Sequence, residues 1–363
     1  MNTARQSPDR PLHIGMTADP VVPVPPILYG GIERIIDFLI RGLVERGHRI
    51  TLFAHPESRI PGTLIPYGVP PHEGPLPRAR ELWQLSSKLI ARHRQFDVVH
   101  SIGRLAALAP LLPLRSVPKV QSYMRDTVPW RSIRIASRLG GRSVAFTGLS
   151  TSVYRERDER GAQGSEWHTI FAGVETGKYT PVAHVPADAP LVFLGRVERI
   201  KGPHDAIAIA RAAGRRLIIA GNLVRTGADP NYYEREVAPH VDGTNVTYVG
   251  PLDDTGKNDL LGRGAALLFP IDVEEAFGIV MAEAFACGTP VIGYARGSVP
   301  EVVREGVNGF VCRDVPGAVA AVARLGEIDR RRVRADCEAR FANESIVSQY
   351  EALYRDLVAR RAQ

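Results

Sequence analysis

The stretch Glu274-Glu-Ala-Phe-Gly-Ile-Val-Met-Ala-Glu-Ala-Phe-Ala-Cys-Gly288 decides how the rest of this chain is interpreted. Short apolar runs flank it at 265–269 and 290–294, and each of them predicts a buried strand. Between these runs, residues 279–287 are apolar enough to form a buried helix. Gly278 opens this helix and the last glycine of the stretch ends it, so the pattern is strand, loop, helix, strand.

Two acidic side chains lie within this apolar stretch, Glu275 in the loop before the helix and Glu283 inside it. Burying a carboxylate is costly unless something binds it, so the pair suggests a site that accepts hydrogen bonds from a polyhydroxyl ligand. The free amides of Gly278 and Ile279 at the helix N-terminus would favour a phosphate or sugar oxygen. The alternative is a solvent-facing loop glutamate and a helix glutamate paired with a nearby arginine.

The spacing Glu275-x7-Glu283, with Phe277-Gly278 between the acids and Cys-Gly-Thr-Pro-Val after them, resembles the signature of the retaining glycosyltransferases of family 4. The resemblance implies the α/β fold called GT-B, in which two Rossmann-like domains with doubly wound parallel sheets face a cleft. It implies that Glu275 lies near the donor sugar and that Glu283 holds the ribose hydroxyls of the nucleotide. Phe277, Gly278 and Ile279 would then bind the donor as well.

Size and composition agree with a soluble protein of two domains. The chain has 363 residues, of which 44% are hydrophobic and 23% charged, and this length suffices for two cores. The net charge of +7 favours anionic partners such as nucleotides, phosphorylated substrates or acidic lipid surfaces. Three dispersed cysteines predict neither a disulfide framework nor a zinc site. No apolar run has the length of a membrane span, and the tail 1–11 lacks a signal-peptide core, so a cytoplasmic location is expected.

The N-terminal half alternates predicted strands with helices, which indicates a parallel, doubly wound sheet. An apolar stripe from Ile35 to Val44 predicts the first helix, and Leu82, Leu85 and Leu89 mark another within 81–92. The strands are expected at 12–18, 49–54, 96–101, 119–123, 144–149 and 169–172. Ligands of such sheets bind beyond the carboxyl ends of the strands.

A glycine pair, Gly30-Gly31, stands at the entry to the first helix. Without side chains, these residues allow the backbone to approach a ligand closely, although a plain tight turn explains them as well. The pair is not a dinucleotide-binding fingerprint, because no GxGxxG is present. The resemblance implies that Gly30 and Gly31 face the donor from across the cleft.

The chain departs from the family after the strand 119–123, where many members carry a histidine. The matching position here is Met124, followed by Arg125 and Asp126. These two residues are candidates for contact with the acceptor. Acceptor contacts are expected in the variable segments 56–80 and 124–142.

A basic segment begins at the same place, with Trp130 and Ile133 interleaved among its cations. The arginines are Arg125, Arg131, Arg134, Arg138 and Arg142. Spacings of three and four predict one positive helix face. This face is a solvated surface, or it docks to an anionic lipid surface at the inner side of the membrane, or it binds a phosphorylated acceptor. Nothing in the sequence resembles a nucleic-acid module, so no nucleic acid is expected as a partner.

A Pro- and Ala-rich stretch, 184–190, is typical of a linker between domains. The strand that follows it, 191–194, delivers Gly195 and Arg196 to its carboxyl end, and Lys201-Gly202 begins the next helical stretch. Two cations on one strand-to-helix loop can bind both phosphates of a diphosphate, although surface charge is the simpler explanation. The resemblance implies that Arg196 and Lys201 act as this phosphate clamp.

The rest of the chain continues the β/α alternation, with strands expected at 216–221 and 246–249. Asn222 follows the first of these strands, where family members contact the base or phosphates, and 297–301 is a further expected site loop. Apolar residues between Ile346 and Leu357 predict an amphipathic C-terminal helix. The resemblance implies that this helix crosses back to the first domain. The expected domains are 1–182 with 343–363, on the acceptor side, and 183–342, which binds the nucleotide sugar.

These observations predict a retaining transferase that moves a sugar from a nucleoside diphosphate sugar, with UDP as the favoured nucleotide, to an acceptor hydroxyl. Glu275, Arg196 and Lys201 are the expected catalytic residues. The sequence has no Asp-x-Asp metal motif, so neither a metal nor a cofactor is expected. The alternatives are a nucleotide-sugar epimerase of the same architecture, a catalytically inactive sugar-nucleotide-binding protein, and a nonspecific polyanion binder whose affinity would collapse with salt.

Overall fold

The computed structural model describes residues 10–27, 30–68 and 75–360. Tertiary contacts divide the chain into two compact units. Unit 1 consists of residues 1–170 and 346–363, and unit 2 of residues 171–345. Parts of the sequence predictions lie outside the described residues: most of the tail 1–11, residues 28–29 before the glycine pair, 69–74 of the expected acceptor segment, and the last three residues of the C-terminal helix.

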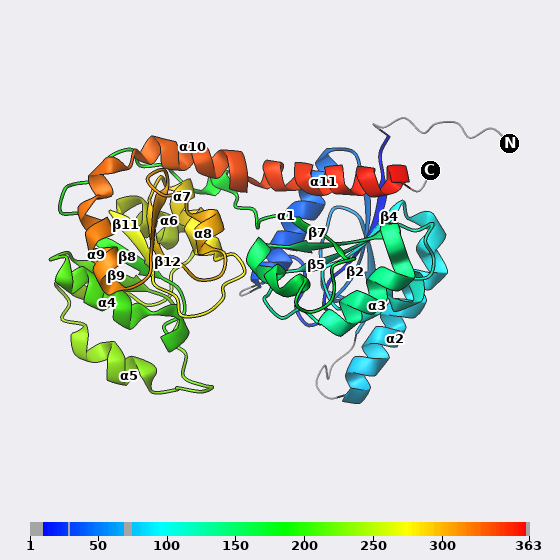
Figure 1. Ribbon diagram of the computed structural model, residues 1–363, viewed down its shortest axis with the longest axis horizontal. Helices are drawn as coiled ribbons and strands as arrows, with labels where there is room; N and C mark the ends of the chain where they lie inside the picture. Colours follow the sequence, from blue (N-terminus) through cyan, green and yellow to red (C-terminus); the bar gives the residue numbers. More distant parts are fainter. Residues whose placement is uncertain (1–9, 28–29, 69–74, 361–363) are drawn as a thin grey trace. The chain divides into compact units, whose positions relative to one another are not determined.

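In unit 1 the described residues form a seven-stranded parallel sheet in the order β3-β2-β1-β4-β5-β6-β7 (Figure 1). Its strands are β1 (His13–Thr17), β2 (Arg49–Ala54), β3 (Thr63–Pro66), β4 (Val98–Ser101), β5 (Lys119–Tyr123), β6 (Val144–Gly148) and β7 (Glu166–Thr169). Its main helices are α1 (Gly31–Glu45), α2 (Pro75–Arg92), α3 (Trp130–Gly140), the 3-10 helix η2 (Leu105–Leu111) and α11 (Asn343–Arg360), whose residues belong to this unit from Ile346 on.

Unit 2 has the same construction, with a six-stranded parallel sheet in the order β10-β9-β8-β11-β12-β13 among its described residues. Its strands are β8 (Leu191–Leu194), β9 (Leu217–Ala220), β10 (Val246–Tyr248), β11 (Ala266–Phe269), β12 (Val291–Tyr294) and β13 (Gly309–Cys312). Its helices are α4 (Pro203–Ala212), α5 (Tyr232–Glu236), α6 (Asp254–Arg263), α7 (Ile279–Ala286), α8 (Val299–Val302), α9 (Val315–Ala323) and α10 (Arg330–Phe341). Two parallel sheets of this kind confirm the predicted fold class.

Different helices cover the two faces of the sheet in unit 1. Side chains of α2, η2 and α3, among them Leu85, Leu89 and Ile133, belong to one core cluster with Val99 of β4. Neighbouring strand residues point to opposite faces, so His100 faces the other side, where α1 and α11 lie. A Cβ atom on Gly42 of α1 would stand 2.6 Å from a methyl group of Val347, so the two helices pack at a close approach.

A buried polar network joins α11 to this sheet. The Nδ1 atom of His100 lies 2.6 Å from the hydroxyl of Tyr354, and its Nε2 lies 2.6 Å from Oγ of Ser122. Ser122 in turn hydrogen-bonds Thr147 at 2.6 Å. Burial lowers the pKa of His100 to about 3, so the ring is neutral at physiological pH and each of its nitrogens has a partner. The C-terminal helix is thereby a structural part of unit 1.

Most predicted elements are confirmed, and three strands differ. The bounds predicted for the strand at 169–172 are wrong: β7 spans Glu166–Thr169. The amide of Ile170 still donates to the carbonyl of Gly148 at 3.0 Å, and the chain leaves the sheet after it. Phe171 packs instead on the rings of Phe277 and Phe341, with ring centroids 5.8 and 5.4 Å apart. Strands β3 and β13 had no counterpart in the prediction. No helix of the described residues has the length and apolar character needed to cross a bilayer.

Candidate functional site

The carboxyl ends of β8 and β9 approach each other closely in unit 2. Gly195 donates its amide to the carbonyl of Ala220 at 3.0 Å, and a Cβ atom on Gly221 would stand 1.8 Å from the carbonyl oxygen of Gly195. Gly221 also has a φ of 141°. A side chain at this position would therefore collide with backbone. The close approach brings the predicted residues Gly195 and Asn222 to neighbouring strand ends. The backbone carbonyl of Asn222 accepts a hydrogen bond from the amide of Val197 at 2.8 Å.

The loop after β8 carries the two predicted cations. Arg196 is half-exposed, and its guanidinium lies 2.7 Å from the carboxylate of Glu198. Lys201 ends a 3-10 turn, η7 (Arg199–Lys201), and is followed by Gly202, whose φ of +73° is left-handed. A Cβ atom on Gly202 would stand 2.0 Å from the carbonyl oxygen of Pro270, just after β11. This contact fixes the loop that holds Lys201 against the end of a second strand.

Lys201 and Glu275 form an ion pair through Nζ and Oε2, and both side chains are mostly buried. Glu275 is held by the loop that was expected to belong to the site: its carbonyl accepts the amide of Ser298 at 2.9 Å. A Cβ atom on Gly297 would stand 2.3 Å from that carbonyl oxygen. The structure therefore brings two predicted catalytic residues into direct contact, whereas Arg196 contacts Glu198.

The helix α7 begins next to this ion pair. Gly278 has a left-handed φ of 74°, and Ile279 starts the helix with 37% of its surface exposed. Phe277 is buried, and its carbonyl accepts a hydrogen bond from Oγ of Ser298 at 2.9 Å. Backbone groups of the Phe277–Ile279 turn therefore lie beside Glu275, while the Phe277 ring packs in the interior.

Glu283 is buried on α7 and is already hydrogen-bonded. Its Oε1 accepts from the hydroxyl of Tyr179 at 2.8 Å and from Nζ of Lys257 at 2.9 Å. Burial and the neighbouring carboxylate raise the pKa of Tyr179, so its hydroxyl stays protonated and donates. Burial opposes the charge of Lys257, but Glu283 outweighs it and raises the pKa of that lysine. The carboxylate thus has a lysine and a tyrosine as partners, in place of the arginine that the alternative interpretation of the sequence named.

Tyr179 and Lys257 were not predicted as site residues. They lie 104 and 26 positions away from Glu283, and neither stands in a motif that was predicted to bind the donor. The segment around Tyr179 was assigned to the end of the first domain, yet its contacts place it in unit 2. The signal that could have found them is the buried glutamate itself, because a buried carboxylate requires donors.

The remaining predicted residues, Gly30, Gly31, Arg125 and Asp126, lie in unit 1. Gly30 precedes α1, and Arg125 follows β5, so both stand at the carboxyl-end edge of the first sheet. A Cβ atom on Gly30 would stand 2.7 Å from a carboxylate oxygen of Glu33. Burial, with a further contribution from Asp19, raises the pKa of Glu33 against the opposing charge of Arg125. The sequence indicated glycines and an arginine at this edge of the first sheet. The structure therefore adds the carboxylates of Asp19 and Glu33 to them.

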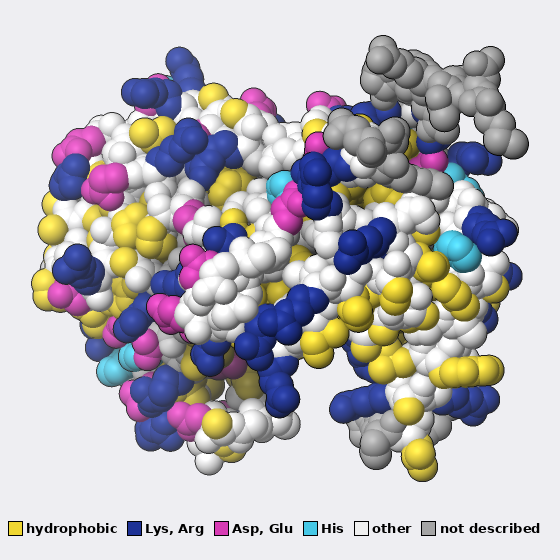
Figure 2. Space-filling model, turned by 45° about the vertical axis from the view of Figure 1, so that its right-hand side comes forward, with side chains coloured by type: hydrophobic (Ala, Val, Ile, Leu, Met, Phe, Trp, Pro, Cys, Tyr) yellow, Lys and Arg dark blue, Asp and Glu magenta, His cyan; other side chains and the backbone are white. Residues whose placement is uncertain are grey.

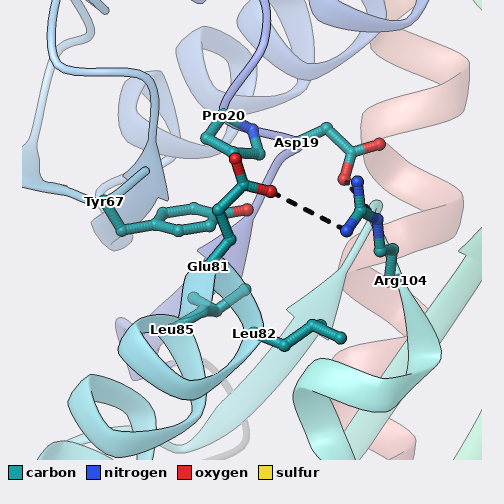
Figure 3. Close-up of a pocket in the computed structure, with 7 residues that line it drawn as sticks. All are labelled: Asp19, Pro20, Tyr67, Glu81, Leu82, Leu85 and Arg104. Atoms are coloured by element: carbon teal, nitrogen blue, oxygen red, sulfur yellow. Dashed lines mark ion pairs between the residues drawn. The ribbon is translucent and has the colours of Figure 1, made fainter. Parts of the chain in front are cut away.

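One of these added carboxylates, Asp19, lines a small pocket in unit 1, shown in Figure 3. Arg104, which follows β4, lies between two carboxylates, with its nitrogens 3.7 Å from Asp19 and 3.8 Å from Glu81. Burial raises the pKa of Asp19, and Glu81 adds to the effect while Arg104 and Arg125 oppose it. Sequence reasoning missed Asp19 and Arg104, although each comes within three residues of a strand end.

Comparisons with known proteins match both halves of the chain to glycosyltransferases. Residues 29–178 match the sequence profile described as Glycosyltransferase Family 4, and residues 183–339 match the profile described as Glycosyl transferases group 1. A glycogen synthase of Mycobacterium tuberculosis is 27% identical over 90% of this chain and 89% of that protein. A D-inositol 3-phosphate glycosyltransferase of Catenulispora acidiphila is 28% identical over 78% of each chain. The crystal structure of AviGT4, a glycosyltransferase of avilamycin A biosynthesis, superimposes with a TM-score of 0.68 at 25% identity, covering 96% of this chain and 98% of that one.

Proposed function

Because the chain belongs to the glycosyltransferases, with residues 29–178 matching the Glycosyltransferase Family 4 profile and residues 183–339 the Glycosyl transferases group 1 profile, we propose that it moves a sugar from a nucleoside diphosphate sugar to an acceptor hydroxyl with retention of configuration. The donor in this proposal is a UDP-sugar. The observation that carries the proposal is the contact of Lys201 with Glu275 beside the start of α7. A cation, a carboxylate and free helix amides there could bind the diphosphate and the sugar of one donor.

The proposed role of the cations is to stabilise the leaving group. When the bond between the sugar C1 and the diphosphate breaks, negative charge grows on the phosphate oxygens. Lys201, Arg196 and the amides at the start of α7 would stabilise that charge, which requires no metal ion in this proposal. Glu275 holds Lys201 in place before the donor binds and would accept hydrogen bonds from the sugar hydroxyls.

The reaction is proposed to take place on one face of the sugar. The acceptor oxygen bonds to C1 on the side from which the diphosphate leaves, and the acceptor proton passes to an oxygen of the departing phosphate. This path needs no protein nucleophile, and it retains the configuration at C1. Glu275 therefore serves to orient the donor and forms no covalent bond to the sugar.

Acceptor hydroxyls are proposed to bind at the edge of the first sheet. Asp19, Glu33, Arg104 and Arg125 lie there within electrostatic range of one another, and they offer both acceptors and donors of hydrogen bonds. Asp126, the other predicted acceptor residue, is exposed next to Arg125. A peripheral contact with an anionic membrane would involve a different surface, because Arg131, Arg134 and Arg138 are exposed on α3.

A thermal-shift panel of UDP, GDP, ADP and TDP with their sugars tests the donor. A ligand that binds only the folded protein raises its melting temperature with concentration, and UDP with its sugars should give the largest shift. Turnover separates the remaining alternatives: an epimerase converts the donor without an acceptor, and an inactive binding protein shows a shift without turnover. A shift of equal size with every polyanion, lost at high salt, would contradict the proposal.

Replacing Glu283 with glutamine should weaken binding of UDP by roughly 10- to 150-fold, because a hydrogen bond to a charged group contributes about 1.5–3 kcal/mol. Calorimetric titration measures the dissociation constant. Glu338→Gln is the matched control, since Glu338 is an exposed helix glutamate paired with Arg334. An unchanged dissociation constant in Glu283→Gln would remove this residue from the donor site.

A further inference from the structure

The helix α2 exposes a row of apolar side chains. Leu76, Trp83 and Ile90 are 81%, 71% and 36% exposed. They are spaced seven residues apart, so they lie on one side of the helix, while Leu85 and Leu89 are buried on the opposite side. An exposed tryptophan in line with two aliphatic side chains is a costly surface to leave in water.

A second helix on the same side of unit 1 repeats this pattern. Ile135 and Leu139, one helical turn apart on α3, are 56% and 44% exposed. Both helices cover the same face of the sheet, because their buried residues, Leu85 of α2 and Ile133 of α3, belong to one core cluster. The exposed apolar side chains of α2 and α3 therefore belong to one side of unit 1, here called the α2–α3 face.

The charges of the α2–α3 face are of one sign. The exposed cations on or beside the same sides of the two helices are Arg80 of α2 and Arg131, Arg134 and Arg138 of α3. Among the described residues of these elements the one acid is Glu81, which is buried. In Figure 2 the lower right-hand end of the molecule, which carries α2, shows hydrophobic side chains with Lys and Arg beside them.

We propose that the α2–α3 face docks on an anionic lipid bilayer, with Leu76, Trp83 and Ile90 entering the headgroup region and the arginines contacting lipid phosphates. Helices that combine Trp and Leu with Lys and Arg, and lack exposed acids, bind at this interface because it satisfies both kinds of side chain. A second copy of the chain fits less well, because a symmetric dimer would bring two identical cationic faces together. The proposal goes beyond sugar transfer and does not require it.

Co-sedimentation of the full chain with vesicles tests the proposal. The protein should bind vesicles of phosphatidylcholine that contain phosphatidylglycerol, release them as salt rises, and bind pure phosphatidylcholine weakly. Replacing Arg134 and Arg138 together with glutamine should lower the partition coefficient by roughly 25-fold, since each surface cation contributes about 1 kcal/mol. Arg331→Gln with Arg332→Gln, an exposed pair on α10 of unit 2, is the matched control and should bind as the unchanged protein does.

The apolar row has its own test, because charge alone could hold the protein on the bilayer. Trp83→Ser should weaken binding to the same vesicles, whereas Val249→Ser, at a 44% exposed valine of unit 2, should not. Trp83→Phe should retain binding but lose the blue shift of tryptophan emission that vesicles cause in the unchanged protein. Transfer to a soluble acceptor should be unaffected by Trp83→Ser, so this result does not depend on the proposed activity.

Three results would overturn the docking proposal. The first is absence of sedimentation with anionic vesicles at every ionic strength. The second is binding that Trp83→Ser leaves unchanged. The third is a dimer in lipid-free solution that Trp83→Ser dissociates, measured by light scattering, which would make the α2–α3 face an interface between two copies of the chain.

Discussion

Replacing Lys201 with alanine should lower kcat for sugar transfer by about 30- to 1,000-fold and change KM for the donor much less. Each cation at a developing charge contributes roughly 2–4 kcal/mol to transition-state stabilisation. In the free protein Lys201 already forms an ion pair with Glu275. Part of its interaction with the ground-state donor therefore replaces this ion pair. The interaction that grows is the one with the departing diphosphate, and its loss appears in kcat. Initial rates over a range of donor concentrations separate the two constants.

Three further variants test whether the two cations act on the same leaving group. Arg196→Lys should restore only part of the rate, because an ammonium group cannot make the planar two-pronged contact of a guanidinium. The double variant Arg196→Ala with Lys201→Ala should be less harmful than the product of the single effects. Lys178→Ala is a control, because Lys178 is an exposed lysine paired with Glu175. If Lys201→Ala raised only KM, Lys201 would contribute to donor binding and not to the chemical step. If neither constant changed, the assignment of Arg196 and Lys201 as a phosphate clamp would be wrong.

Replacing Gly202 with alanine should lower the free energy of unfolding of unit 2 by about 2–5 kcal/mol. The residue has a left-handed φ, which costs an L-residue roughly 1–2 kcal/mol, and the new methyl group would stand 2.0 Å from the carbonyl oxygen of Pro270. Relief of that clash requires backbone to move, at a further cost of about 1–3 kcal/mol. Urea denaturation, followed by probes in each unit, measures the change.

The other end of α4 provides the matched control. Gly214 has a φ of +62°, and a Cβ atom there would meet nothing within 4 Å. Gly214→Ala should therefore cost the left-handed strain alone. Gly202→Ala should also weaken donor binding, because Gly202 is joined to Lys201. Equal losses of stability in the two variants would show that the Pro270 contact does not constrain the loop.

Much of the fold was predictable because its strands are continuous apolar runs bounded by turn residues. The ranges predicted at 49–54, 119–123 and 191–194 are those of β2, β5 and β8. The misses have different physical reasons. The strand β3 stands at a sheet edge and has no fully buried residue, so its burial pattern is weak. The edge strand β13 is largely buried, and burial does not explain why it was missed. At 169–172, Phe171 packs on aromatic rings of unit 2, and apolar periodicity does not distinguish such packing from burial in a sheet.

The candidate site was predictable as a set of residues but not as a set of contacts. Lys201 and Glu275 were each identified from a motif of their own. The sequence did not predict that these two residues, 74 positions apart, contact each other directly. Tyr179 became visible only when the chain was folded, because nothing near it in the sequence requires a partner. Asp19 and Arg104 follow strand ends, but charged loop residues are too common for their position alone to identify them.

Because Tyr354 of α11 covers His100, the two units should complete their folding at different times during synthesis of the chain. Residues 1–170 leave the ribosome long before residue 346, yet the α1 side of their sheet is completed by α11. Until then the imidazole of His100 and the packing surface of Gly42 have no helix to cover them. Unit 2, which is continuous in sequence, can finish folding first. A fragment that ends near residue 170 should therefore be a poor reagent for studying acceptor binding, whereas 171–345 is the piece to express alone for studying the donor.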